Sequence, residues 1–165
     1  MEDLVRARSS SPAPRPLEMD PLREADALQE AQLLDSRVCP LTSVAALLFE
    51  MRTSLQFKDG NSALLVVRGL RSFGWTSSAE QMPFMALTAL SSAPGRAGGS
   101  FRLRIGFHPE AELVAAGDLA EFYLLDAQGI GDAPPDYPDA DRVRIHRGLP
   151  SWSSRCDLLQ ASFLQ

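Results

Sequence analysis

A chain of 165 residues, 45% apolar and 22% charged, is long enough for one domain with a hydrophobic core and too short for two ordinary ones. Its apolar runs fall short of the ~20 residues that a membrane-spanning helix needs, and the Pro- and Ser-rich start lacks the apolar core of a secretory signal. Cys39 and Cys156 stand outside any paired metal or redox spacing. We therefore expect a cytoplasmic protein with reduced cysteines, a disulfide between the two being the alternative.

The first third of the chain predicts a tail and then a helix. Residues 1–19 mix charge, serine and proline and predict a disordered tail, which leaves a single domain at residues 20–165. Asp20 and Pro21 suit the N-cap and first position of a helix, and Glu24 and Asp26 follow in its early turns. The apolar positions that follow are few and alanine-rich, so we predict a peripheral helix over residues 20–35.

The stretch from Ala46 to Trp75 predicts a β-hairpin. Apolar residues recur at alternate positions from Leu47 to Phe57, which is the period of a half-buried strand. A tight connection at residues 58–61 leads to a second strand that is apolar on both faces over residues 63–67. This hairpin is the predicted frame of the domain.

The remaining segments also predict strands. We expect strands at 84–92 and 100–108, a hairpin over 112–116 and 119–126 that turns at Gly117-Asp118, a strand at 142–146, and a final strand or short helix at 156–164. Flexible or proline-rich connections fill 91–99 and 128–141. The predicted fold is α+β and mainly β: an antiparallel meander of about six to seven strands with one N-terminal helix.

No motif for a chemical reaction stands out. The sequence contains no P-loop, no dinucleotide-binding glycine motif after a strand and no nucleophile elbow. His108, Glu110 and Glu112 are ligand-type side chains at alternate positions, and His146 with Asp139 or Asp141 could join them, but the spacing is looser than recognised zinc patterns. We therefore predict no catalytic residue, no metal and no cofactor, and we do not expect an enzyme.

The charges are distributed in blocks. Seven basic and three acidic residues lie between Glu50 and Pro109, whereas residues 110–141 hold nine acidic residues and no basic one. Glu50 beside Arg52 is interpreted as a surface pair of small energetic value. Mutual compensation explains the blocks, and a polarised surface for a partner is the alternative. The candidate partner-binding residues are Asp132, Asp136, Asp139, Asp141, Arg102 and Arg104.

Three segments carry a resemblance to a known class of proteins. LLFEMRTSLQF, GNSALLVVRGLRSFGW and GLPSWSSRCDLLQASFL resemble, in general layout over residues 44–164, small uncharacterised bacterial proteins that accompany polymorphic toxins as immunity proteins. The resemblance implies a single α+β domain that binds and blocks a toxin, often through an acidic surface. It assigns a role to no individual residue.

Two functions follow as hypotheses. The first is a non-catalytic, immunity-type protein-binding module whose acidic segment meets a basic protein partner, since complementary charge steers association. The second is a protein that binds a small apolar ligand in a sheet or barrel, with Phe73, Trp75, Phe101 and Phe107 lining the pocket, although alternation explains these aromatics as core residues. The net charge of -5 does not favour nucleic acid. A flat acidic face would favour the first hypothesis, and a deep apolar pocket with convergent polar groups would favour the second.

Overall fold

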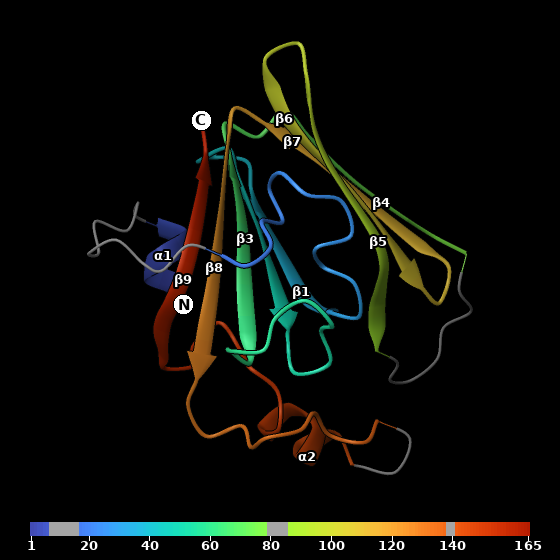
Figure 1. The fold of residues 1–165 in the computed structure, drawn as a ribbon, viewed down its shortest axis with the longest axis vertical. Helices are drawn as coiled ribbons and strands as arrows, with labels where there is room; N and C mark the ends of the chain where they lie inside the picture. The colour runs from blue at the N-terminus through green and yellow to red at the C-terminus, as the bar shows by residue number, and fades with distance from the viewer. Residues whose placement is uncertain (7–16, 79–85, 138–140) are drawn as a thin grey trace.

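The computed structural model describes residues 1–6, 17–78, 86–137 and 141–165 (Figure 1). Within these ranges the chain forms nine strands and two short helices, so the mainly β antiparallel prediction is confirmed, but six to seven strands were too few. The helices are α1 (Glu2–Arg6) and α2 (Arg142–Arg147). The strands are β1 (Gln32–Cys39), β2 (Val44–Glu50), β3 (Ser62–Arg68), β4 (Ser72–Ser77), β5 (Leu87–Ala97), β6 (Ser100–His108), β7 (Ala111–Gly117), β8 (Leu119–Ala127) and β9 (Cys156–Leu164).

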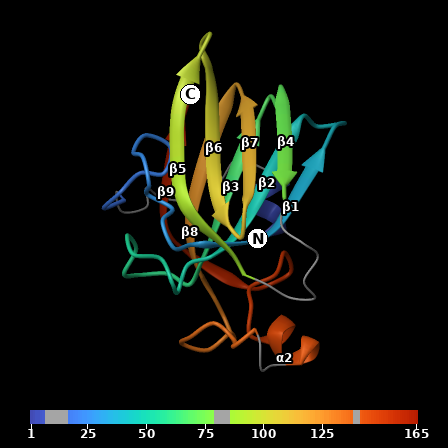
Figure 2. The ribbon, with the colours of Figure 1, turned by 90° about the vertical axis from the view of Figure 1, so that its right-hand side faces the viewer.

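The strands form one antiparallel sheet that folds back on itself. Their order is β4-β7-β6-β5-β1-β2-β3-β8-β9. At the middle of this order, β1 and β5 share only two residue pairs, Gln32 with Thr88 and Leu33 with Leu87. The half β4-β7-β6-β5 therefore turns to face the half β1-β2-β3-β8-β9 (Figures 1 and 2).

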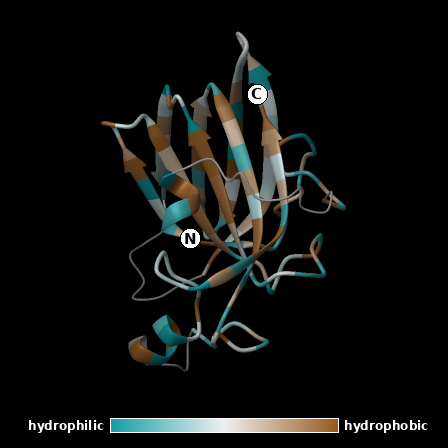
Figure 3. Cartoon of the chain, turned by 90° about the vertical axis from the view of Figure 1, so that its left-hand side faces the viewer, coloured by the Kyte–Doolittle hydropathy of each residue, from teal (hydrophilic) through white to brown (hydrophobic). Residues whose placement is uncertain are grey.

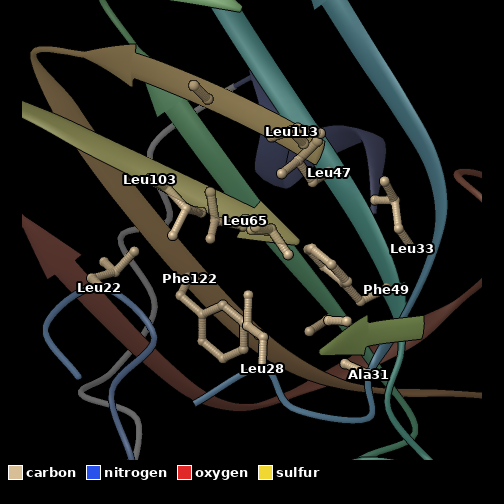
Figure 4. Packing of buried hydrophobic residues seen from close by; sticks show 14 of the residues in the cluster. Leu22, Leu28, Ala31, Leu33, Leu47, Phe49, Leu65, Leu103, Leu113 and Phe122 are labelled. Atoms are coloured by element: carbon tan, nitrogen blue, oxygen red, sulfur yellow. The ribbon is translucent and has the colours of Figure 1, made fainter. Parts of the chain in front are cut away.

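The main core lies between the two halves. Leu103 on β6, Leu113 on β7, Leu65 on β3 and Phe122 on β8 are fully buried in one cluster, as Figure 4 shows. Leu103 and Leu113 take inward-facing positions of strands whose burial alternates, as the sequence predicted for β6, whereas Leu65 and Phe122 lie on strands that are buried on both faces. The segment before β1 closes one side of the core, with Leu28 and its neighbours in the same cluster.

The helix predicted over residues 20–35 is wrong. Asp20 does begin one turn, because its Oδ1 accepts from the Leu22 amide at 3.0 Å. The residues that follow are not helical. The Asp26 amide donates to the Ser92 carbonyl at 2.7 Å, and the Glu30 amide donates to the Ala89 carbonyl at 2.9 Å. These bonds to β5 replace helical ones, so residues 21–30 form turns and residues 32–39 form β1.

The predicted hairpin is confirmed in its pairing and corrected in its length. β2 pairs with β3 over seven residue pairs, from Val44 with Arg68 to Glu50 with Ser62. The first strand was predicted to run to Phe57, but it ends at Glu50, and a loop fills residues 51–61 with Leu55 66% exposed. The Met51 amide still donates to the Asn61 carbonyl at 3.1 Å, and this bond closes the loop at its base.

The hairpin predicted at Gly117-Asp118 is also wrong. β7 pairs with β6 and β4, whereas β8 pairs with β3 and β9, so this connection carries the chain from one half of the sheet to the other. The crossing is tight: a Cβ on Gly117 would lie 2.6 Å from Cγ1 of Val67. A side chain does not fit there, which explains the glycine.

The strand predicted at 142–146 is the helix α2. Asp141 caps it, because its side chain accepts from the Arg144 amide at 2.9 Å. The alternation of Val143 and Ile145 fits a strand equally well, and the N-cap at Asp141 favours the helix instead. Residues 156–164 form a strand, one of the two predicted alternatives.

The outer face of the β2-β3-β8-β9 region carries a second apolar cluster. Val44, Ala46, Leu64 and Val66 are buried there by segments that lie over the strands. One cover is α1, which lies in front of the strands in Figure 3. Within the predicted disordered tail, residues 2–6 are therefore helical and Leu17 packs against the main core, while residues 7–16 lie outside the described residues. Neither of the two helices has the length or apolar content needed to cross a membrane in the part of the chain that the structure describes.

Candidate functional site

The second cover of the outer face is the arm, which we define as the described residues 128–137 and 141–155 between β8 and β9. The arm includes α2 and lies at the end of the molecule where β8 stops (Figure 1). Ile145 and Trp152 are its anchors, with exposed fractions of 1% and 6%. Trp152 belongs to the outer-face cluster, so the arm is part of the packed structure.

Arg52 fastens the arm to the sheet. Its Nη1 donates to the carbonyls of Ile130 and Ala133, both at 2.7 Å, and its Nη2 donates to the Gly148 carbonyl at 2.7 Å. Its Nε also donates to Oε1 of Glu50 at 2.7 Å. The side chains of Arg52 and Glu50 are 5% and 0% exposed, so the predicted surface pair is in fact buried. A planar guanidinium with five donors suits this role because it satisfies several acceptors at once.

Two further side chains tie the arm to β1. The Trp152 indole Nε1 donates to Oδ2 of Asp35 at 2.6 Å, and the Tyr137 hydroxyl donates to Oε1 of Gln32 at 2.8 Å. The guanidinium of Arg37 lies 4.5 Å from the centre of the Trp152 ring, within the range of a cation–π contact. The arm is therefore held at several points along β1.

A pocket of about 540 Å³ remains between the arm, β1 and the start of β5. Such a volume lies within the ~300–1,000 Å³ range of small-molecule sites. Its apolar lining comes mainly from Leu33, Leu34, Leu48, Leu87, Ile145 and Leu149. Its polar lining comes from Asp35, Tyr137, His146 and Ser151. We call this cavity the arm pocket.

A β-bulge shapes the β1 wall of the arm pocket. The pairing of β1 with β2 shifts register between Leu33 and Asp35, which leaves Leu34 as an extra residue. As a result Leu34 and its neighbour Asp35 both line the pocket, although adjacent residues of a regular strand point to opposite faces. The bulge thus brings an apolar and a charged group to one wall.

The polar groups of the arm pocket have defined hydrogen-bonding characters. Burial, followed by the negative charge of Glu50, raises the pKa of Tyr137 to about 12. Its hydroxyl is therefore protonated at neutral pH and donates to Gln32. Asp35 accepts from the Trp152 indole and, at 2.8 Å, from the Ser36 amide, and a carboxylate retains further lone pairs for a third donor. The pocket consequently combines an apolar body with an acceptor at its edge.

The six predicted partner-binding residues do not gather on one surface. Asp132, Asp136 and Asp141 are exposed on the arm, and Asp139 lies outside the described residues. Arg102 and Arg104 are exposed on the outer face of β6, in the other half of the sheet, and Arg104 pairs with Glu112 at 2.5 Å.

The two groups also lie toward opposite ends of the molecule. Arg102 pairs in register with Ala116, next to the crossing at residues 117–118 where β8 begins. The arm begins where β8 ends. The predicted surface therefore divides into two separate regions.

The four aromatic residues predicted to line a ligand pocket belong to the main core or its edge. Phe101 and Phe107 are 2% and 4% exposed, and Phe73 packs against the same cluster. Trp75 contacts Phe107 with ring centres 5.8 Å apart and is 42% exposed at the edge of the sheet. Alternation had already indicated this core role.

The two histidines that were considered as possible metal ligands lie in different parts of the structure. His146 lines the arm pocket, whereas His108 ends β6 and is not part of the lining. In the described ranges no three His, Cys, Asp or Glu side chains are grouped so as to hold a metal ion. Cys39 and Cys156 are both free thiols.

Sequence reasoning missed most of the arm pocket. Asp35 was assigned to the end of a helix and Tyr137 to a proline-rich connection, and Trp152 lies outside every predicted strand and helix. The only available signal was the presence of two aromatic residues, Tyr137 and Trp152, in segments that were otherwise predicted to be exposed. Comparisons with protein-family models, curated proteins and solved structures found no match to this chain.

Proposed function

We propose that this chain is a non-catalytic binding protein whose arm pocket takes a small, mainly apolar ligand with one hydrogen-bond donor. The observation that carries the proposal is the pocket of about 540 Å³, with five leucines and one isoleucine in its lining and Asp35 at its edge. The apolar lining supplies affinity through the removal of apolar surface from water, and the carboxylate selects a ligand that donates.

The immunity-type function stays a prediction, and the geometry supports it less. Asp132, Asp136 and Asp141 are exposed on the arm, as an acidic contact surface requires, but they do not share a surface with Arg102 and Arg104. The arm pocket instead resembles the feature that favours a small-ligand protein, because aliphatic side chains and four polar side chains line one partly open cavity.

The test uses two probes with the same aromatic body. N-phenyl-1-naphthylamine is neutral and carries an N–H donor, and 1-anilinonaphthalene-8-sulfonate adds a negative charge. In a Trp75→Phe background, Trp152 is the sole tryptophan of the chain, which contains two. We expect the neutral probe to quench Trp152 and to bind at least about five-fold more tightly than the sulfonate, because Asp35 repels the anion.

The matched variants are Asp35→Asn and Asp126→Asn. Asparagine at position 35 keeps an acceptor for the Trp152 indole and removes the charge, so we expect the preference for the neutral probe to fall to about two-fold or less. Asp126 is exposed at the end of β8 and is not part of the pocket lining, so its variant serves as the control. Failure of the neutral probe to quench Trp152, or equal effects of the two variants, would contradict the proposal.

A further inference from the structure

The strand β4 ends the sheet on one side, and its outer edge has no neighbouring strand among the residues that the structure describes. The Ser78 amide donates to the Glu110 carbonyl at 3.1 Å, and the β4–β7 register places these two residues opposite each other. Because bonded positions alternate along an antiparallel pair, Phe73 and Trp75 direct their backbone N–H and C=O groups away from β7. Five of the six residues of β4 are exposed, so this outer row of backbone groups is accessible.

The opposite edge of the sheet, β9, is protected against further pairing. Its register with β8 shifts between Leu124 and Leu125, which marks a bulge, and Asp157 places a charge on the strand. Arg23 also covers β9, because its Nη2 donates to the Phe163 carbonyl at 2.9 Å. By contrast, the β4 sequence SFGWTS contains no charge and no proline, and its register with β7 is unbroken over six residue pairs. An edge without such protection is a template for pairing with another chain.

Gly74, in the middle of β4, has no explanation within a single copy of the chain. A Cβ added there would meet no atom within 4 Å, and the φ of Gly74 is not in the left-handed region. Glycine weakens the interior of a strand, and it often marks a place where another backbone approaches closely. In the described part of the chain no strand lies beside the outer edge of β4. The glycine therefore points to a strand from outside the chain.

We propose that β4 pairs antiparallel with β4 of a second copy of this chain, which joins the two nine-stranded sheets in a dimer with two-fold symmetry. Phe73 and Trp75 restrict the register, because only residues with outward backbone groups can form bonded pairs. With the two-fold axis at Gly74, Phe73 of each copy bonds to Trp75 of the other. Gly74 then lies opposite Gly74 of the second copy as a non-bonded pair, in which the Cα atoms are about 4.5 Å apart.

The side chains of β4 suit pairing with themselves. Phe73 and Trp75 point to the same face of the strand, so an axis at Gly74 creates two aromatic cross-strand pairs. Trp75 is 42% exposed in a single copy and therefore has apolar surface left to bury. Arg71 is the only charged residue in the paired stretch 71–77, and it lies opposite the uncharged Ser77 of the second copy, so no like charges meet. No residue of β4 lines the arm pocket, and the dimer goes beyond the proposed function.

The test measures self-association of the full chain by sedimentation velocity. Protein concentrations from about 1 µM to about 500 µM cover the weak affinities expected of a small interface. We expect the wild type to change from monomer to dimer within this range. In the Trp152→Phe variant Trp75 is the sole tryptophan, and we expect its emission to shift to shorter wavelength over the same concentrations, because pairing removes water from the indole.

Charges at position 74 test the two-fold axis. Gly74→Lys places two positive charges directly opposite each other, so we expect the dissociation constant of the dimer to rise at least about ten-fold. Gly74→Asp is expected to have the same effect through two negative charges. An equimolar mixture of the two variants is expected to restore dimers, because opposite charges then meet at the axis.

Gly95→Lys is the matched control. A Cβ on Gly95 also meets no atom within 4 Å, but Gly95 lies on β5, which has a neighbouring strand on each side. We therefore expect Gly95→Lys to leave the dissociation constant unchanged.

Three results would overturn the proposal. One is a wild type that remains monomeric throughout, which would leave the β4 edge to a strand of a different protein. The second is a dimer that Gly74→Lys weakens no more than Gly95→Lys does, which would place the interface elsewhere. The third is a mixture of Gly74→Lys and Gly74→Asp that stays monomeric, which would attribute the loss of dimers to damage within β4.

Discussion

At the scale of single residues, two buried glutamate–arginine pairs fasten the covers of the outer face. Glu50 orients Arg52 toward carbonyls of the arm, and Glu121 orients Arg68 toward carbonyls of α1. In both cases the carboxylate is buried and the guanidinium reaches a segment distant in sequence. A buried carboxylate is costly without its cation, so these pairs fix the covers in one position.

The buried pair of Arg52 and Glu50 predicts that Arg52→Ala lowers the free energy of unfolding much more than Arg104→Ala does. Arg52→Ala leaves Glu50 buried without its cation and frees the bonded arm carbonyls, so we expect a loss of about 3–5 kcal/mol in the free energy of unfolding. Arg104→Ala removes an exposed pair with Glu112 and is expected to cost under about 1 kcal/mol. Urea denaturation of the two variants measures both. Equal losses would contradict the buried role of Arg52.

The raised pKa of Tyr137 predicts that the stability of the folded chain decreases at alkaline pH. Its pKa is about 12 in the folded chain and near its ordinary value of about 10 in the unfolded chain. Between these values the unfolded state releases a proton that the folded state keeps, so stability is complete below pH 10 and falls as the pH rises toward 12. The difference in urea midpoint between the wild type and Tyr137→Phe is expected to shrink over this range. A constant difference from pH 9 to pH 12 would contradict the assignment.

At the scale of elements, the connections determine this fold more than the strands do. A single residue, Asp118, separates β7 from β8, and the amide of Asp118 donates to the Arg68 carbonyl at 2.9 Å. This bond holds the crossing against the end of β3. The two halves of the sheet are therefore joined by a chain segment with almost no slack.

The crossing predicts that Gly117 tolerates no side chain. A Cβ at Gly117 would meet Val67 and the Arg68 carbonyl at 2.6 and 2.8 Å, whereas a Cβ at Gly95 would meet no atom within 4 Å. We expect Gly117→Ala to lower the free energy of unfolding by about 2 kcal/mol or more through displacement of β3, and Gly95→Ala to change it by under about 0.5 kcal/mol. Thermal melts of the two variants test this. Similar melting temperatures would show that the crossing can relax.

At the scale of the whole molecule, the shared core links the two halves. The main cluster contains inward-facing residues of β2, β3 and β8 together with those of β6 and β7. Neither half can keep its apolar face buried without the other, which favours one cooperative transition.

The two tryptophans allow that cooperativity to be measured. Trp75 lies on β4 in one half, and Trp152 lies on the arm beside the other. Trp152→Phe leaves Trp75 as the reporter, and Trp75→Phe leaves Trp152. For each variant, the midpoint of unfolding is measured both by tryptophan fluorescence and by circular dichroism. We expect the two midpoints of the same variant to coincide. A fluorescence midpoint that departs from the dichroism midpoint in either variant would indicate separate unfolding.

Local sequence patterns predicted the interiors of strands. They failed where contacts between residues far apart in the sequence determine the structure. The alternation in residues 100–108 was sufficient for β6, because each strand residue responds to burial of its own face. The turn at residues 26–30 was not predictable, since bonds to β5 override the helical signals of Asp20 and Pro21. The arm pocket escaped prediction for the same reason: Asp35 and Trp152 meet across 117 positions of sequence.

The one-residue crossing has a mechanical consequence for the arm pocket. β8 starts at the crossing, and the arm starts at its far end, nine residues or about 30 Å away. A change of about 2° in the angle between the halves, pivoting at the crossing, would therefore displace the pocket walls by on the order of 1 Å. The pocket takes Leu33 from one half and Leu87 from the other, and these two residues form one of only two ladder pairs that join the halves there. A ligand bound between them would act where the two halves share the fewest residue pairs, about 30 Å from the crossing.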